Sequence, residues 1–202
     1  MRTNRELFDL SGQVAIVTGG AYGLGIQMAY ALGEAGANLV IASRNMDRCV
    51  NVSARLKAEL GRKVLPARLD LTKPDEIDAF YDLVMSSFGR LDILVNNSGT
   101  IWVDSPLKLS LEAWKTVIDT NLTGLWLMCQ KAGKIMINQR YGRIINISSA
   151  EGMVGSQGQF VACPPYNASK AAIIGLTKDL GVKWAKHNVN VNALCPGWFP
   201  SD

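Results

Sequence analysis

The stretch VAIVTGGAYGLG, residues 14–25, decides how this chain folds. It opens with a short apolar run rich in β-branched residues, which is typical of a strand covered on both faces. A glycine-rich turn follows, and residues 26–35 then carry apolar side chains at helical spacing. The glycines let the backbone approach a phosphate closely, and the start of a helix offers unpaired N–H groups. We predict a pyrophosphate site here, with a plain turn as the weaker alternative.

The same alternation of apolar runs and helical patterns continues along the chain. It predicts further strands at 38–42, 63–69, 91–95, 143–147 and 189–194, and helices at 47–60, 76–88 and 166–186, with one long helix capped by Ser110. Such alternation favours parallel strands with right-handed crossovers. Pro66 interrupts the third strand, which indicates a sheet edge. We therefore expect a doubly wound α/β (Rossmann) fold with strand order 3-2-1-4-5-6.

Length and composition fit a single domain over residues 1–202, in which residues 1–12 form an N-terminal arm. The 21 basic and 17 acidic residues are interspersed and give a formal charge of +4, which favours neither a nucleic-acid nor a membrane surface. No apolar run reaches the about 18 residues of a membrane span, and no signal-peptide core follows Met1. We expect a cytoplasmic protein.

The cysteines and the single histidine argue against a metal site and against a serine hydrolase. The four cysteines lie far apart without a CxxC motif, His187 is the only histidine, and no GxSxG motif occurs. Cys163 precedes a tyrosine of interest and either faces a substrate or fills space as a reduced thiol.

Tyr166 and Lys170 indicate a second site, together with Ser149 at the end of the fifth expected strand. Residues four apart lie on one face of a helix, so the lysine ammonium can reach the phenol. A nearby cation lowers the pKa of a phenol from about 10, which makes it a usable acid or base near neutrality. The serine hydroxyl can bind the same substrate oxygen. An unremarkable Tyr/Lys pair on a surface helix is the alternative.

Residues at the ends of other strands suit a dinucleotide. Ser43 and Arg44 stand where an acidic residue would accept the ribose hydroxyls of NAD, and they suit a 2′-phosphate instead. NADP(H) is therefore the expected cofactor, with NAD possible; Arg44 as a solvated loop charge is the competing interpretation. Asp70 either bonds to the adenine amino group or caps the next turn. The pair Asn96-Asn97 can tie neighbouring strands together.

Taken together, these motifs resemble the short-chain dehydrogenase/reductase family. The matching pieces are TGGAYGLG (18–25), LDLT (69–72), NNSG (96–99), TNLTG (120–124), INISSAEG (145–152), YNASK (166–170) and PG (196–197). They are similar to the branch that acts on carbonyls and alcohols. The run LFDLSGQVAIVTGG resembles sugar and polyol members of the gluconate 5-dehydrogenase type, and 3-oxoacyl-carrier-protein reductases share the other motifs about equally.

The resemblance implies roles for individual residues. Tyr166 would pass a proton to or from the substrate oxygen, Lys170 would lower its pKa and hold the nicotinamide ribose, and Ser149 would orient the carbonyl. Asn121 would hold a water that links Lys170 to solvent. The residues implied to line the cofactor are Gly19, Tyr22, Gly23, Leu24, Gly25, Ser43, Arg44, Asp70, Leu71, Asn96, Asn97, Ser98, Gly99, Tyr166, Lys170, Pro196 and Gly197.

The implied activity is the NADP(H)-dependent interconversion of a secondary alcohol and a ketone, on a sugar acid or polyol or on a 3-oxoacyl thioester. Trp102, Met153, Cys163 and Trp198 are expected beside the substrate. Family members usually continue with a C-terminal lid and a seventh strand, which we expect to be absent here; a non-catalytic NAD(P)-binding module is therefore the alternative. Apolar helical stretches at 114–136 and 173–184 favour a homo-oligomer, a dimer or tetramer, if the C-terminus is complete.

Overall fold

The computed structural model describes residues 3–155 and 162–199. Within these ranges, six parallel strands form one sheet in the order β3-β2-β1-β4-β5-β6, which confirms the predicted doubly wound arrangement. The strands are β1 (Val14–Thr18), β2 (Asn38–Ser43), β3 (Val64–Arg68), β4 (Ile93–Asn96), β5 (Gly142–Ile147) and β6 (Val189–Leu194). Pro66 lies in β3, which forms the edge of the sheet. Proline has no N–H group to donate, and an edge strand tolerates this because only one of its sides is paired.

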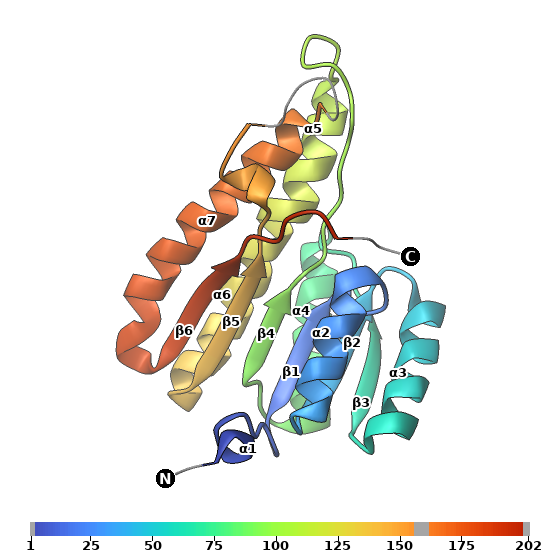
Figure 1. Cartoon of the computed structure of the whole chain (residues 1–202), viewed down its shortest axis with the longest axis vertical. Helices are drawn as coiled ribbons and strands as arrows, with labels where there is room; N and C mark the ends of the chain where they lie inside the picture. The colour runs from blue at the N-terminus through green and yellow to red at the C-terminus, as the bar shows by residue number, and fades with distance from the viewer. Residues whose placement is uncertain (1–2, 156–161, 200–202) are drawn as a thin grey trace.

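Helices cover both faces of this sheet. They are α1 (Asn4–Leu7), α2 (Gly23–Glu34), α3 (Met46–Leu60), α4 (Pro74–Phe88), α5 (Leu111–Ile118), α6 (Gly124–Gln139) and α7 (Pro164–Trp184). Figure 1 shows α2 and α3 in front of the sheet and α4 and α6 behind it. Each layer has its own apolar cluster: Ile41 and Leu56 belong to the first, and Ile16, Met128 and Ile173 to the second. No helix among the described residues is both long and apolar enough to cross a membrane.

Local signals set where the helices begin and end. The side chain of Asn45 caps α3 by accepting a hydrogen bond from the Arg48 N–H (3.0 Å), and Gly61 ends the helix with a left-handed φ of 63°. Helix α4 begins at Pro74, before the predicted residue 76, because proline fits the first position of a helix.

The long helix predicted after Ser110 is interrupted. Ser110 caps α5 as predicted, and its hydroxyl accepts from the Ala113 N–H (3.1 Å). A π-helical turn at Asp119–Thr123 then separates α5 from α6. Such a turn inserts an extra residue and shifts the helical register, a feature frequent at functional sites. The side chain of Asn121, inside this turn, is buried.

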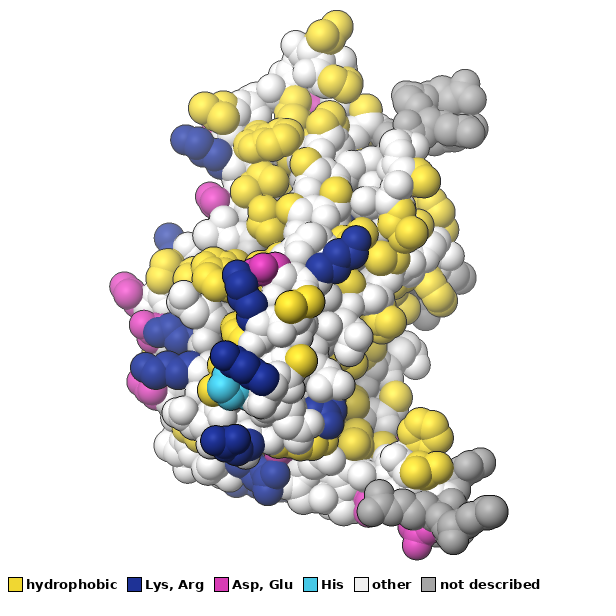
Figure 2. Space-filling model, turned by 90° about the vertical axis from the view of Figure 1, so that its left-hand side faces the viewer, with side chains coloured by type: hydrophobic (Ala, Val, Ile, Leu, Met, Phe, Trp, Pro, Cys, Tyr) yellow, Lys and Arg dark blue, Asp and Glu magenta, His cyan; other side chains and the backbone are white. Residues whose placement is uncertain are grey.

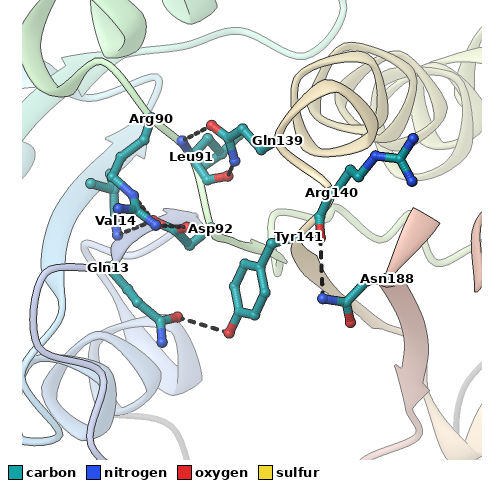
Figure 3. Close-up of polar contacts among 9 residues, drawn as sticks. All are labelled: Gln13, Val14, Arg90, Leu91, Asp92, Gln139, Arg140, Tyr141 and Asn188. Carbon is teal, nitrogen blue, oxygen red and sulfur yellow. Dashed lines mark hydrogen bonds and ion pairs between the residues drawn. The ribbon is translucent and has the colours of Figure 1, made fainter.

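A polar cluster holds the sheet together at the amino ends of β1, β4 and β5 (Figure 3). The side chain of Asp92 is 0% exposed, accepts a hydrogen bond from the Val14 N–H (2.9 Å) and pairs with Arg90 (2.7 Å). Gln139 at the end of α6 bonds to both the N–H and the carbonyl of Leu91 (3.1 and 2.7 Å). This cluster lies at the end of the sheet opposite to the site described next.

Candidate active site

The carboxyl ends of the strands border a cavity of about 880 Å³. The segment after β6 runs across these ends (Figure 1) and lines the cavity with residues 196–199. A second cavity of about 460 Å³ shares Ser149, Tyr166 and Gly197 with the first and also reaches Lys170. Ligands of open α/β sheets bind at this edge.

The predicted cofactor residues mostly meet in the larger cavity. Those that line it are Gly19, Tyr22, Gly23, Leu24, Ser43, Arg44, Asp70, Leu71, Asn97, Ser98, Gly99, Tyr166, Pro196 and Gly197. Lys170 borders the smaller cavity. Gly25 and Asn96 line neither cavity among the described residues.

The glycine turn forms a cradle that fits a phosphate group. Gly19 has a φ of 64°, and a Cβ there would lie 2.9 Å from the amide nitrogen of Asn97. Helix α2 begins at Gly23, earlier than the predicted Ile26, so its first turn directly follows this cradle. Gly25 acts through packing instead: it is buried, and a Cβ there would lie 2.2 Å from the carbonyl oxygen of Gly19. Its small size lets α2 start against the turn.

The two asparagines at the end of β4, Asn96 and Asn97, have different roles. The Asn97 amide donates to the carbonyl of Thr18 (3.1 Å), which fixes the glycine turn to the neighbouring strand. Asn96 is 3% exposed, and its amide donates to Asn146 (2.9 Å), which in turn donates to Thr177 on α7 (3.0 Å). The side chain of Asn96 therefore joins β4 to β5 and α7 and lines neither cavity among the described residues, and its predicted cofactor contact stays a prediction.

Charged groups gather where β2 and β3 end. Burial pushes the pKa of Asp70 up, but hydrogen bonds from Thr72 and the nearby Arg44 and Lys73 outweigh it and leave that pKa below its ordinary value. The Asp70 carboxylate accepts from the N–H and the hydroxyl of Thr72 (3.0 and 2.8 Å), so it stabilises its own turn as well as lining the cavity.

Two arginines of α3 lie near this end of the cavity, one of them in its lining, and the sequence alone does not single them out. Arg55 lines the cavity, and its guanidinium lies 5.4 Å from the centre of the Tyr30 ring. Arg48 lies 5.8 Å from the centre of the Tyr22 ring in the glycine turn. Their seven-residue spacing places both arginines on one face of the helix, and this spacing is the feature of the sequence that could have indicated them.

Ser149, Tyr166 and Lys170 come together beside the end of β5. Ser148, the other serine of the pair, donates its hydroxyl to the Lys170 carbonyl (2.7 Å) and so anchors α7 to the strand. The Lys170 ammonium donates to the carbonyl of Ile147 (2.7 Å) and lies 5.4 Å from the centre of the Tyr166 ring. The structure thus places the Ser149 hydroxyl and the Tyr166 phenol on a wall shared by the two cavities, with the Lys170 ammonium bordering the smaller one.

The expected acidic tyrosine is not what these residues produce. Burial raises the pKa of the Tyr166 phenol; a hydrogen bond with Ser149 lowers it, and Cys163 and Glu151 raise it further, for a net increase. Lys170 is not among the causes of this shift, and its ammonium donates to the Ile147 carbonyl. Its predicted lowering of the tyrosine pKa stays a prediction. Burial instead lowers the pKa of Lys170 to about 8.

The buried lysine makes stability depend on pH. Between pH 8 and about 10.5 the unfolded chain binds more protons than the folded one, so this group opposes folding fully below pH 8 and progressively less above it. The cost below pH 8 is about 3 kcal/mol, against about 1 kcal/mol for its hydrogen bond. We expect Lys170→Met to raise the free energy of unfolding by about 2 kcal/mol at pH 7 in urea titrations.

This advantage should shrink steadily as the pH rises from 8 towards 10.5. Lys178→Met is the matched control, because Lys178 is exposed on the same helix. A gain that is identical for both variants, or independent of pH, would show that Lys170 carries no burial cost.

Hydrogen bonds of its side chain hold Asn121 in place. Its oxygen accepts from the Thr100 N–H (2.8 Å), and its amide donates to the Thr100 carbonyl (2.9 Å) and to Ser169 on α7 (3.1 Å). A Cβ on Gly99 would lie 3.4 Å from the Asn121 oxygen and 3.6 Å from the Lys170 nitrogen, so the three positions are neighbours. The water predicted to link Asn121 and Lys170 stays a prediction.

The substrate end of the larger cavity is partly apolar. Of the residues expected there, Cys163 and Trp198 line it, whereas Trp102 and Met153 are exposed and line neither cavity among the described residues. The Cys163 thiol donates to the side-chain oxygen of Asn167 (3.2 Å). Ile101, Phe199 and Glu151 also line this end, and the sequence alone does not single them out. These residues come from separate loops, so only the tertiary fold shows that they line one cavity.

Comparison with known proteins agrees with this geometry. The chain is 37% identical over 196 residues to a 3-oxoacyl-[acyl-carrier-protein] reductase of Synechocystis sp., covering 96% of this chain and 76% of the relative. It is 40% identical over 196 residues to a 2-dehydro-3-deoxy-D-gluconate 5-dehydrogenase of Escherichia coli, covering 96% and 75%.

A solved structure is also similar. L-Sorbose reductase from Gluconobacter frateurii, complexed with NADPH and L-sorbose, superposes with a TM-score of 0.91 at 30% identity, over 96% of this chain and 72% of that one. The family model for short chain dehydrogenases matches residues 13–202. On this match, and with the sheet order and the site just described, the chain belongs to the short-chain dehydrogenase family of oxidoreductases.

Proposed function

We propose that this enzyme interconverts a secondary alcohol and a ketone with NADP(H) as cofactor. The observation that carries the proposal is the meeting of Ser149, Tyr166 and the glycine turn in one cavity, with Lys170 behind the phenol. A bound nicotinamide would supply the hydride chemistry, and the protein would supply orientation and a proton.

The side chains suit these tasks. The Ser149 hydroxyl can donate to the substrate oxygen and hold it beside the phenol of Tyr166. Since the pKa of Tyr166 is raised, the phenol carries its proton at neutral pH and can act as the general acid when a ketone is reduced. The Lys170 ammonium, next to Gly99 and the smaller cavity, can bind a ribose hydroxyl.

The preference for NADP(H) rests on the cationic end of the cavity. Arg44 and Arg55 line it beside the Ser43 hydroxyl, and Arg48 stacks on Tyr22 at its border. A 2′-phosphate requires such cations and donors. The L-sorbose reductase structure contains NADPH, which supports the same choice for this chain.

Arg44→Ala should weaken NADPH binding by about 10- to 100-fold, because one charge-assisted contact contributes about 1.5 to 3 kcal/mol. NADH binding should change by less than about threefold. Both affinities can be measured by titration of the protein fluorescence.

Lys57→Ala is the control for the loss of a positive charge, since Lys57 is exposed further along α3. Equal losses for NADPH and NADH in Arg44→Ala would contradict a 2′-phosphate contact.

The activity itself is tested with a panel of substrates. We expect NADPH oxidation with at least one member of a set of ketoses, keto-sugar acids and β-ketoacyl thioesters, the classes that its relatives' names suggest. Tight binding of NADPH without reduction of any of these substrates would favour the alternative, a non-catalytic binding module. No observation on the described residues supports that alternative.

We also propose that the chain forms a homo-oligomer through the side on which α7 lies. Figure 2 views this side and shows hydrophobic side chains gathered over its upper part, with most lysines and arginines below. Leu111 on α5, Trp126 on α6 and Val182 on α7 are each among the exposed large apolar residues. Sedimentation of a monomer at micromolar concentration would contradict this. The cytoplasmic location stays a prediction.

A further inference from the structure

Glu151 has a fixed place at the substrate end of the larger cavity. It lies in a short 3₁₀ turn, Ala150–Gly152, in which the Ser149 hydroxyl accepts from the Glu151 N–H (3.2 Å). The Ala150 N–H donates to the carbonyl of Pro196 (2.9 Å). A Cβ on Gly152 would lie 2.6 Å from the backbone of Lys170, so the turn sits directly on α7. Its position is therefore set by the same contacts that place the candidate catalytic groups.

The carboxylate of Glu151 faces the start of α7. The amide of Asn167, the residue after Tyr166, donates to it (3.2 Å), and the side-chain oxygen of Asn167 accepts from Cys163. Burial is the main cause of the raised pKa of Tyr166, and Glu151 adds a smaller contribution in the same direction.

The distribution of charge along the cavity makes this carboxylate important. The charged residues that line the larger cavity within the described chain are Arg44, Arg55, Asp70 and Glu151. The first three lie where β2 and β3 end and along α3, and Glu151 lies beside Ser149. Lys170 borders the smaller cavity, with its ammonium bound to the Ile147 carbonyl. Glu151 is therefore the charged residue of the larger cavity that lies next to Ser149, while the Lys170 ammonium lies 5.4 Å from the centre of the Tyr166 ring on the side of the smaller cavity.

We propose that Glu151 determines substrate specificity: it accepts a hydrogen bond from a hydroxyl of a neutral polyhydroxy ketone and disfavours substrates that carry a carboxylate. The inference rests on the proposed function and narrows its substrate class. Like charges at short range in a partly buried site repel strongly, whereas a carboxylate accepts hydroxyl hydrogen bonds readily. Both effects favour the neutral substrate.

The test compares L-sorbose with 5-keto-D-gluconate, a neutral and an anionic six-carbon substrate, with NADPH at pH 7. The wild-type enzyme should have the higher kcat/KM for L-sorbose. Glu151→Gln, which keeps the shape and removes the charge, should shift the ratio of the two kcat/KM values at least tenfold towards the keto acid. Glu112→Gln, on the exposed surface of α5, should leave the ratio unchanged.

A ratio within twofold of wild type in an active Glu151→Gln enzyme would overturn the specificity role and leave the oxidoreductase intact. If wild type reduces neither compound, calorimetry with D-gluconate and D-glucitol on the NADPH-bound protein decides instead. Glu151→Gln should then gain at least tenfold in affinity for gluconate relative to glucitol, and an unchanged relative affinity would overturn the proposal without turnover.

Discussion

Tyr166→Phe is expected to lower kcat by about 10²- to 10⁴-fold, the contribution of a positioned acid or base. The phenylalanine ring fills the same space between the two cavities, and only the hydroxyl that would give or take the proton is lost. NADPH affinity should fall by no more than about fivefold, the worth of one neutral hydrogen bond. Steady-state rates with the best substrate of the panel, together with NADPH titrations, check both expectations.

Tyr141→Phe is the matched control. Its hydroxyl lies at the opposite end of the sheet, where it donates to the side chain of Gln13 (3.3 Å; Figure 3). This variant should retain wild-type turnover. Normal turnover by Tyr166→Phe would remove the proton-transfer role, whereas loss of NADPH binding in that variant would indicate damage to the fold.

The fold is the part of this protein that its sequence predicts well. The run Val14–Thr18 was expected as a strand covered on both faces, and all five of its residues are buried. Runs of this kind are recognised because strand formation, glycine turns and helix caps depend on neighbours in the sequence. Pro66 also predicted the sheet edge correctly. Its missing N–H group is visible in the sequence, and it excludes the residue from the centre of a sheet.

The direction of individual side chains is predicted less well. Asn96 and Asn97 are adjacent, and successive residues of a strand point to opposite faces. One amide therefore lies in the layer with α7, and the other reaches the glycine turn. The sequence shows two candidate ligands, but only the packed sheet tells which one can touch a cofactor.

Electrostatic environment is the least predictable property. Tyr166 and Lys170 share a helix face as their spacing requires, yet the ammonium binds the Ile147 carbonyl, which comes from a strand. Burial then lowers the lysine pKa and raises the tyrosine pKa. Glu151 acts on the phenol only because its turn packs against α7. Such effects follow from tertiary contacts, which no local pattern encodes.

The two ends of the sheet thus differ in what their polar groups do. At the carboxyl ends, Ser149 and Glu151 border a cavity that can admit a ligand. At the amino ends, Asp92 and Gln139 are bonded to backbone groups of neighbouring elements and line neither cavity among the described residues. Substitutions at the amino ends should therefore change stability and leave ligand affinity unchanged.

Asp92→Ala should lower the free energy of unfolding by roughly 1.5 to 3 kcal/mol, the contribution of hydrogen bonds to a charged group, because only the Asp92 side of its pair with the half-exposed Arg90 is buried. The Asp92 carboxylate is fully buried, and its removal leaves the Val14 N–H without its acceptor and Arg90 without both of its hydrogen bonds. Urea unfolding at pH 7, followed by circular dichroism, measures the loss, and NADPH affinity at a temperature where the variant is folded should stay within about twofold of wild type.

Asp179→Ala is the control for the stability loss in Asp92→Ala. The partner of Asp179, Lys183, lies four residues away on α7, and both side chains are more than half exposed. Removing such a helical pair should cost only about 0.3 to 0.5 kcal/mol. Comparable losses in the two variants would mean that water reaches Asp92 freely and that the amino-end cluster does not hold β1 to β4. A much larger loss for Asp92→Ala, with cofactor binding intact, would separate the element that stabilises the sheet from the site built at its other end.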